Sequence, residues 1–137
     1  MPGEPTRIVD ASQIRSYYND TGATLPVGRS VMLDSTEHFI KLPTATTDRL
    51  NGVTMAAIPD DEWGDIQIGG VALVAAHAAL ATPGVALMST AATGRCTTFA
   101  AGAGVNAQLV GQLRTTAGAQ DDLVEVELAS PGALQQG

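Results

Sequence analysis

Short runs of alternating apolar and polar residues, separated by turn residues, recur along the chain. The clearest group lies in residues 51–75, where alternating runs at 53–58 and 65–68 precede an apolar run at 71–75. A period of two in hydrophobicity is typical of strands with one buried face. The polar corner between the first two runs holds a proline and a glycine, which interrupt sheet pairing. We therefore expect a β-meander at the centre of a small all-β domain.

The second run of this group predicts which side chains face the core. Alternation places Ile66 and Ile68 on one face of the strand and Asp65 and Gln67 on the other. We expect the two isoleucines to be buried and the two polar residues to be exposed. The glycine pair at 69–70 permits a bulge or a sharp bend before the next strand.

Six further strands are predicted by the same signals. They cover residues 30–33, 38–42, 85–89, 96–99, 108–113 and 123–128. The alanine-rich run at 76–81 has high helix propensity. It is short and Thr-Pro-Gly follows it at once, so we expect an extended or irregular connection. Short strands separated by turns every ~8–12 residues are typical of a small β-barrel or β-sandwich.

The two ends of the chain lack a sustained period. Residues 1–20 have two early prolines and mixed charge, and close on Tyr17 and Tyr18. This segment is either a frayed terminus or an arm that docks on a neighbour by adding a strand to a sheet edge. We expect an N-terminal arm at 1–20, a β-barrel domain at 21–130 and a C-terminal tail at 131–137.

The composition indicates a light hydrophobic core. The 137 residues fit one domain, but they include only two Phe, two Tyr and one Trp. Burying a large aliphatic or aromatic side chain contributes roughly 1.5–3 kcal/mol, and alanine contributes far less. Such a domain gains from burying further surface against copies of itself or a partner, which favours an oligomer.

Charge and hydropathy exclude several classes of partner. The formal net charge is −7, and the seven basic residues are scattered singly rather than clustered as phosphate binding requires. No apolar run approaches the ~20 residues of a membrane span. A signal peptide is not evident, and the single Cys96 cannot form an internal disulfide. We expect a soluble protein that is not secreted and binds neither nucleic acid nor membrane.

The sequence offers no convincing cofactor or metal site. Residues 102–107 fit a degenerate dinucleotide-binding fingerprint, but that motif needs a strand–helix context and the surrounding pattern is all-β. The adjacent carboxylates at 60–62 and 121–122 lack the alternating spacing of a calcium loop. His38 and His77 lack the spacing and companion ligands of a zinc site. We expect neither a cofactor nor a metal.

Catalysis finds equally little support. The chain has no G-x-S-x-G turn, and Cys96 has no nucleophile signature around it. We therefore expect that the protein is not an enzyme and that it has no catalytic residues.

A series of short motifs follows in order from Asn19 to Leu128. The motifs are NDTGATL (19–25), VGRSV (27–31), NGV (51–53), GDIQIGGVALV (64–74), PGVAL (83–87), TGR (93–95), VGQL (110–113) and VEVEL (124–128). Their order and spacing resemble those of the small phage head decoration proteins, also called capsid cement proteins. The resemblance implies a small, β-tulip-like barrel with an N-terminal arm.

The resemblance also implies a structural role. Decoration proteins bind the outer surface of the expanded head, commonly as trimers, and clamp the major capsid protein against internal DNA pressure. The implied partners are the major capsid protein and further copies of this chain. The implied location is the outside of the virion, after synthesis in the host cytoplasm. Related β-rich domains also occur in phage fibres and spikes.

Two sets of contact residues are predicted. The capsid-binding set lies on the expected arm and comprises Thr6, Arg7, Ile8, Val9, Ile14, Arg15, Tyr17 and Tyr18. The self-association set comprises apolar residues of the central meander that we expect to be exposed, namely Met55, Ile58 and Trp63.

Two other functions stay open. The first is a fibre or spike domain that binds a receptor or a glycan. The second is a small hydrolase or ligand-binding barrel, which needs a concave polar pocket with a perturbed titrating group.

Overall fold

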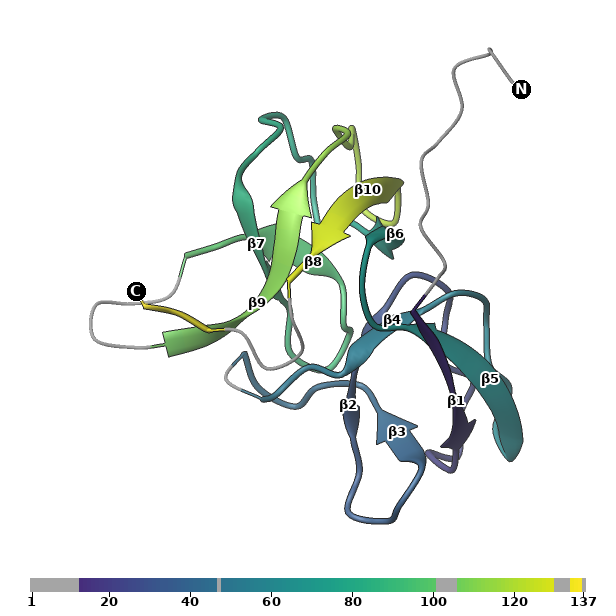
Figure 1. The fold of residues 1–137 in the computed structure, drawn as a ribbon. Coiled ribbons are helices and arrows are strands. Elements are labelled where there is room, and N and C mark those ends of the chain that lie inside the picture. The colour runs from purple at the N-terminus through teal and green to yellow at the C-terminus, as the bar shows by residue number, and fades with distance from the viewer. Residues whose placement is uncertain (1–12, 47, 101–105, 130–133, 137) are drawn as a thin grey trace.

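The computed structural model describes residues 13–46, 48–100, 106–129 and 134–136, in which every regular element is a strand (Figure 1). The strands are β1 (Ile14–Asn19), β2 (Ser30–Leu33), β3 (Phe39–Lys41), β4 (Gly52–Thr54), β5 (Glu62–Gln67), β6 (Val71–Ala75), β7 (Ala86–Ser89), β8 (Cys96–Thr98), β9 (Asn106–Leu113), β10 (Leu123–Leu128) and β11 (Leu134–Gln136). The all-β fold class is therefore confirmed. Within these residues no helix is long and apolar enough to cross a membrane.

The first five strands form a closed barrel in the order β1-β3-β2-β4-β5, and β5 pairs back with β1. β1 runs parallel to β3 and antiparallel to β5. Closure leaves the barrel without a free strand edge of the kind that promotes aggregation. The barrel core consists of five aliphatic side chains, each at most 2% exposed: Leu25, Val31, Ile40, Ile58 and Ile66.

The later strands form a second sheet in the order β6-β10-β9-β7-β8, with β11 paired to β9. Its two edges meet where Ala76 forms a parallel bridge with Cys96, and the N–H of His77 donates to the Cys96 carbonyl at 2.9 Å. The sheet thus curls around a second core, rich in valine and leucine, to which Leu50 and Val53 of the barrel half also contribute. Figure 1 shows the barrel in the lower half and this sheet above it.

Backbone hydrogen bonds join the barrel to the second sheet. The N–H of Ala75 donates to the Gly28 carbonyl at 2.7 Å, and the N–H of Ser30 donates to the Gly94 carbonyl at 2.8 Å. Gly28 has φ of 70°, and a Cβ there would lie 2.7 Å from the Leu123 side chain. Only glycine suits both the backbone angle and the close approach. The glycines at 28 and 94 of the sequence motifs therefore serve the packing of the two halves.

Most predicted strands are confirmed. The strands at 30–33, 71–75 and 123–128 match at both ends, and those at 38–42, 85–89, 96–99 and 108–113 match within two residues. The run at 76–81 is not helical, as expected.

The strand expected at 53–58 is wrong in its extent. β4 ends at Thr54, and the chain bends before Ile58 forms an isolated bridge with Leu25. The corner is correspondingly narrower than expected, because β5 begins at Glu62. Pairing with β1 extends β5 into residues whose composition indicates a turn, so tertiary contacts override local preference.

Gln67 corrects the predicted orientation of side chains in β5. Ile66 is buried as expected, but Gln67 is also buried, at 2% exposed. Its amide donates to the carbonyls of Gly69 at 2.9 Å and Val71 at 3.0 Å. A buried amide is tolerated because these bonds replace those to water. Gln67 therefore holds the bend that separates the barrel from the second sheet.

The expected segment boundaries are wrong at both ends. Residues 14–19, assigned to the arm, form β1 and close the barrel, because β5 supplies a partner along their whole length. Residues 134–136, assigned to the tail, form β11. The expected domain at 21–130 also contains two sheets with separate cores rather than one barrel. Residues 1–12 lie outside the described residues, as do residues 102–105 of the dinucleotide-like motif at 102–107.

Candidate interaction surface

An aromatic patch lies on the outside of the barrel, formed by Tyr18, His38, Phe39 and Trp63. The strand register places Phe39 and Trp63 on either side of Tyr18, on β3 and β5. The ring centroid of Tyr18 lies 5.1 Å from that of Phe39 and 5.6 Å from that of Trp63, and His38 lies 6.2 Å from Trp63. These separations are typical of favourable aromatic pairs.

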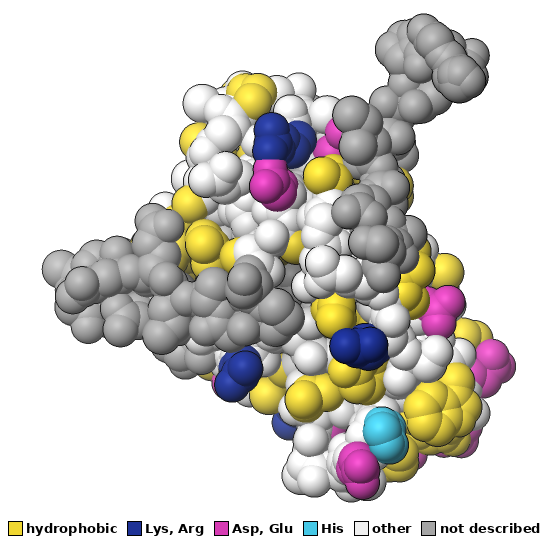
Figure 2. Space-filling model, in the orientation of Figure 1, with side chains coloured by type: hydrophobic (Ala, Val, Ile, Leu, Met, Phe, Trp, Pro, Cys, Tyr) yellow, Lys and Arg dark blue, Asp and Glu magenta, His cyan; other side chains and the backbone are white. Residues whose placement is uncertain are grey.

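The patch is open to solvent. Trp63 is 59% exposed, which makes it the most exposed large hydrophobic residue of the described chain. Figure 2 shows hydrophobic side chains gathered beside a histidine and acidic side chains at the barrel end of the molecule. Exposed aromatic groups of this kind mark interaction sites more often than scattered aliphatic residues do.

Four carboxylates lie close to the patch in space or along the chain: Asp20, Asp60 and Asp61, whose charges act on Tyr18, and Glu62, which precedes Trp63 on β5. The hydroxyl of Tyr18 donates to Asp61 Oδ1 at 3.3 Å. The pKa of Tyr18 is raised, first by partial burial and then by the negative charge of Asp61, with Asp20 and Asp60 adding to it. None of the four carboxylates forms an ion pair with any residue that the structure describes.

Asn19 fixes the loops beside this patch. It is fully buried, and its Nδ2 donates to the carbonyls of Ala23 and Ile58, both at 2.8 Å. Its Oδ1 accepts from the N–H of Thr21 at 3.0 Å and from the Thr21 hydroxyl at 2.7 Å. This asparagine-based turn explains the start of the NDTGATL motif, because local side-chain bonds favour turns over regular pairing.

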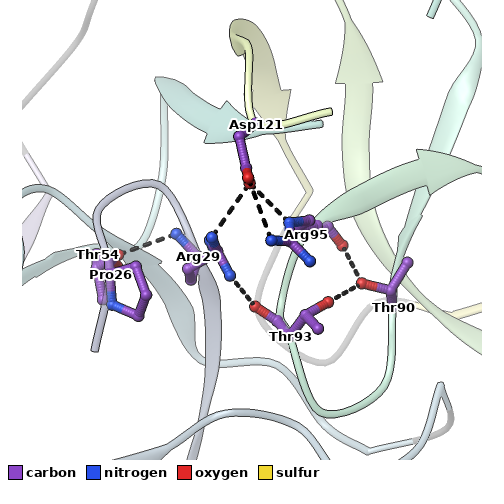
Figure 3. A network of polar contacts seen from close by, with 7 residues as sticks. All are labelled: Pro26, Arg29, Thr54, Thr90, Thr93, Arg95 and Asp121. Carbon is purple, nitrogen blue, oxygen red and sulfur yellow. Dashed lines mark hydrogen bonds and ion pairs between the residues drawn. The ribbon is translucent and has the colours of Figure 1, made fainter. Parts of the chain in front are cut away.

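A second polar cluster, formed by Arg29, Arg95 and Asp121, lies at the junction of the barrel and the second sheet. Arg29 precedes β2, Arg95 precedes β8 and Asp121 precedes β10 (Figure 3). Asp121 Oδ1 accepts from Arg95 Nε at 2.7 Å and from an Arg29 nitrogen at 3.2 Å. Arg29 also donates to the Thr93 carbonyl at 2.9 Å. The cluster therefore ties the barrel to two loops of the second sheet.

The charges of this cluster depend on one another. The pKa of Asp121 is lowered, mainly by the hydrogen bond from Arg95, with the charges of both arginines adding to it. Burial lowers the pKa of Arg29, as does the nearby charge of Arg95, while Asp121 opposes both. A guanidinium stays charged in proteins. The carboxylate of Asp121 therefore reduces the repulsion between the charges of Arg29 and Arg95. No sequence pattern predicts this cluster, because its members are far apart along the chain.

The candidate chemical groups Cys96, His38 and His77 do not come together at one place in the described structure. Burial raises the pKa of Cys96 to about 12, so its thiol stays protonated at neutral pH. The described residues contain no group of three or more His, Cys, Asp and Glu side chains that could hold a metal. His38 lies in the aromatic patch, and His77 lies beyond β6 beside Cys96.

The predicted contact residues occupy different places. Thr6, Arg7, Ile8 and Val9 lie outside the described residues, and Ile14, Arg15, Tyr17 and Tyr18 lie on β1. Tyr17 packs partly against the barrel core, whereas Tyr18 joins the aromatic patch.

The self-association set is only partly exposed. Ile58 is 2% exposed in the barrel core, so the expectation that it is exposed is wrong. Met55 is half-buried, and Trp63 is exposed. The pattern of residues 53–58 predicts an exposed Ile58, but the bend after Thr54 turns this side chain inward. Tyr18 of one predicted set and Trp63 of the other meet on a single surface.

Comparison with known proteins finds similarity in structure but none in sequence. No protein family matches the sequence, and no curated protein does either. The fold is similar to the crystal structure of the head fibre gp8.5 N base of bacteriophage phi29, with a TM-score of 0.63 and 10% sequence identity. The match covers 88% of this chain and 96% of that one. At this identity, the likeness establishes the shared fold.

Proposed function

We propose that this chain is a non-catalytic phage head decoration protein that binds the outer surface of the capsid and stabilises the lattice of the major capsid protein. The main support is the fold shared, over nearly all of both chains, with a base domain of a phage head fibre. The ordered motifs of residues 19–128 add to it. The exposed aromatic patch supplies a surface suited to a protein partner.

The mechanism is geometric rather than chemical. Each chain makes a modest contact, and a trimer that bridges several capsid subunits gains about 10²–10⁴-fold in avidity through effective concentration. A protein that binds only the assembled lattice stabilises that lattice by mass action, by about 2.7 kcal/mol per site at a free concentration of 100 times Kd. Neither effect requires a reactive side chain.

Binding is tested with heads purified from a mutant of the encoding phage that lacks this gene. We expect the purified chain to co-sediment with these heads and to saturate at a copy number that scales with the number of capsid subunits. Failure to co-sediment at any concentration would refute the proposal.

A head-fibre base is the second candidate, because the structural neighbour is itself named as such a base. Copy number separates the two functions. A decoration protein occupies equivalent positions over the whole lattice, whereas a fibre base occupies sparse sites. Saturation at a few copies per head, without added resistance to heat, would favour the fibre base.

A further inference from the structure

We propose that the aromatic patch and the carboxylates near it receive a positively charged segment of the partner, with an arginine or lysine side chain over the ring of Trp63 and paired with Asp61. This inference rests on the proposed function, since it assigns the capsid-binding surface and the chemistry of the segment that binds there.

The rings provide a preformed platform. Tyr18, Phe39 and Trp63 lie on three neighbouring strands of a closed barrel, and their spacing is fixed by strand register. Trp63 packs edge-on against Tyr18, which leaves much of its ring exposed. A cation over a tryptophan face is attracted by the negative face of the ring, and more strongly when the site is desolvated.

The negative charge of the carboxylates near the patch favours a positively charged ligand. Elsewhere in the described chain, Asp34, Glu127 and Asp121 each lie within ion-pair distance of Lys41, Arg114 or two arginines. The carboxylates at 20 and 60–62 have no such partner among the described residues. Adjacent like charges repel, so a basic segment relieves a cost that the free protein carries.

Asp61 is held in place for this role. Its backbone adopts φ of 62°, and its N–H donates to the Asn19 carbonyl at 2.7 Å. Its side chain accepts from Tyr18 at 3.3 Å, which leaves further lone pairs for a guanidinium or ammonium group. A neutral glycan could stack on Trp63, but it would leave the carboxylates uncompensated. The charge therefore favours a basic peptide segment over a glycan.

The first test measures binding of a dye-labelled peptide that alternates arginine with glycine and serine, by fluorescence anisotropy. We expect saturable binding that weakens steeply between ~20 and ~500 mM NaCl. Trp63 is the only tryptophan, so a change in its intrinsic fluorescence on titration places the peptide at the patch. A matched peptide with glutamine in place of arginine should bind at least about 10-fold more weakly.

Variants locate the binding site. Trp63→Ala and the double change Asp61→Asn with Glu62→Gln should each weaken peptide binding by about 10-fold or more. Asparagine suits the positive φ at position 61 and keeps the acceptor for Tyr18. The charge-matched control is Glu125→Gln with Glu127→Gln on β10, which should bind like the wild type. Equal binding by all variants, or salt-independent binding of a neutral oligosaccharide instead, would overturn the proposal.

The same variants on heads separate this inference from the proposed function. If the wild type co-sediments with heads and the two patch variants do not, the inference holds. If all variants co-sediment equally, the proposed function stands and the assignment of this surface fails. If the wild type itself does not bind heads, the proposed function fails, and the peptide result decides whether the patch binds cations.

Discussion

Asn19 carries more of the local structure than any other polar side chain near the patch. Four hydrogen bonds converge on it, and it is fully buried. We expect Asn19→Ala to lower the free energy of unfolding by about 1–3 kcal/mol, because the four hydrogen bonds of the Asn19 side chain are lost. The loss is moderate because the carbonyls of Ala23 and Ile58 each keep one other donor. Urea denaturation followed by circular dichroism measures the change.

Ser16→Ala is the matched control, since Ser16 lies on the same strand but makes one exposed hydrogen bond to Asp65. It should change stability by less than about 0.5 kcal/mol. A similar small effect for Asn19→Ala would contradict the account of the NDTGATL motif.

Asp121 makes the stability of the folded protein depend on pH, because it is ionised beside two arginines at the junction. Because its pKa is lowered in the folded protein, the ionised form stabilises the native state above the unfolded value of about 3.9, and this contribution is lost as the pH falls through the folded value. We expect Asp121→Asn to lower Tm at pH 7 and to differ progressively less from the wild type below about pH 4. Thermal melts over this range measure the difference.

Asp20→Asn is the control for this series, because Asp20 has no ion-pair partner among the residues that the structure describes. Its Tm should follow that of the wild type from pH 7 downward. If Asp121→Asn melts with the wild type at pH 7, the junction cluster does not hold the two halves together.

At the scale of elements, β1 decides how much of the N-terminus can be removed. It pairs with β5 over six residues, and the carbonyl of Gln13 accepts from the N–H of Ile68 at 2.9 Å. Deleting residues 1–12 should leave Tm nearly unchanged, whereas deleting 1–16 should unfold the barrel, because β5 then loses half of its partner. Circular dichroism melts compare the two truncations with the full chain.

The shorter truncation also separates the two halves of the predicted capsid-binding set. If deleting 1–12 abolishes head binding without loss of folding, Thr6, Arg7, Ile8 and Val9 carry the contact. If head binding survives, it rests on the body, as the aromatic patch requires. A truncation at 12 that fails to fold would contradict the assignment of β1 as the first strand of the barrel.

The strands that the sequence predicts well have a clear hydrophobic pattern between turn residues. β10 alternates clearly, β6 is a continuous apolar run, and turn residues bound both strands. β1 was missed because its sequence, IRSYYN, has no clean hydrophobic period. Gln67 was misplaced because its burial depends on carbonyls of the next bend, which no period of two reveals.

At the scale of the whole molecule, the sequence identified two residues of the patch but not the patch. The sequence predicts Tyr18 as a capsid contact on the arm and Trp63 as a self-association contact of the central meander, so the two residues are assigned to different surfaces. They meet because barrel closure pairs β1 with β5, a contact set by topology rather than by spacing. Ile58, three residues from Asp61, faces inward because the chain bends after Thr54 and bridges to Leu25.

The central claim is that this chain stabilises a phage head by binding its outside. The most direct measurement is the temperature at which DNA is released from heads that lack the chain, recorded with and without saturating purified protein. An equal mass of an unrelated acidic protein serves as the control. We expect the bound chain to raise the release temperature and the control to leave it unchanged; bound heads that release DNA at the same temperature as bare heads would contradict the claim.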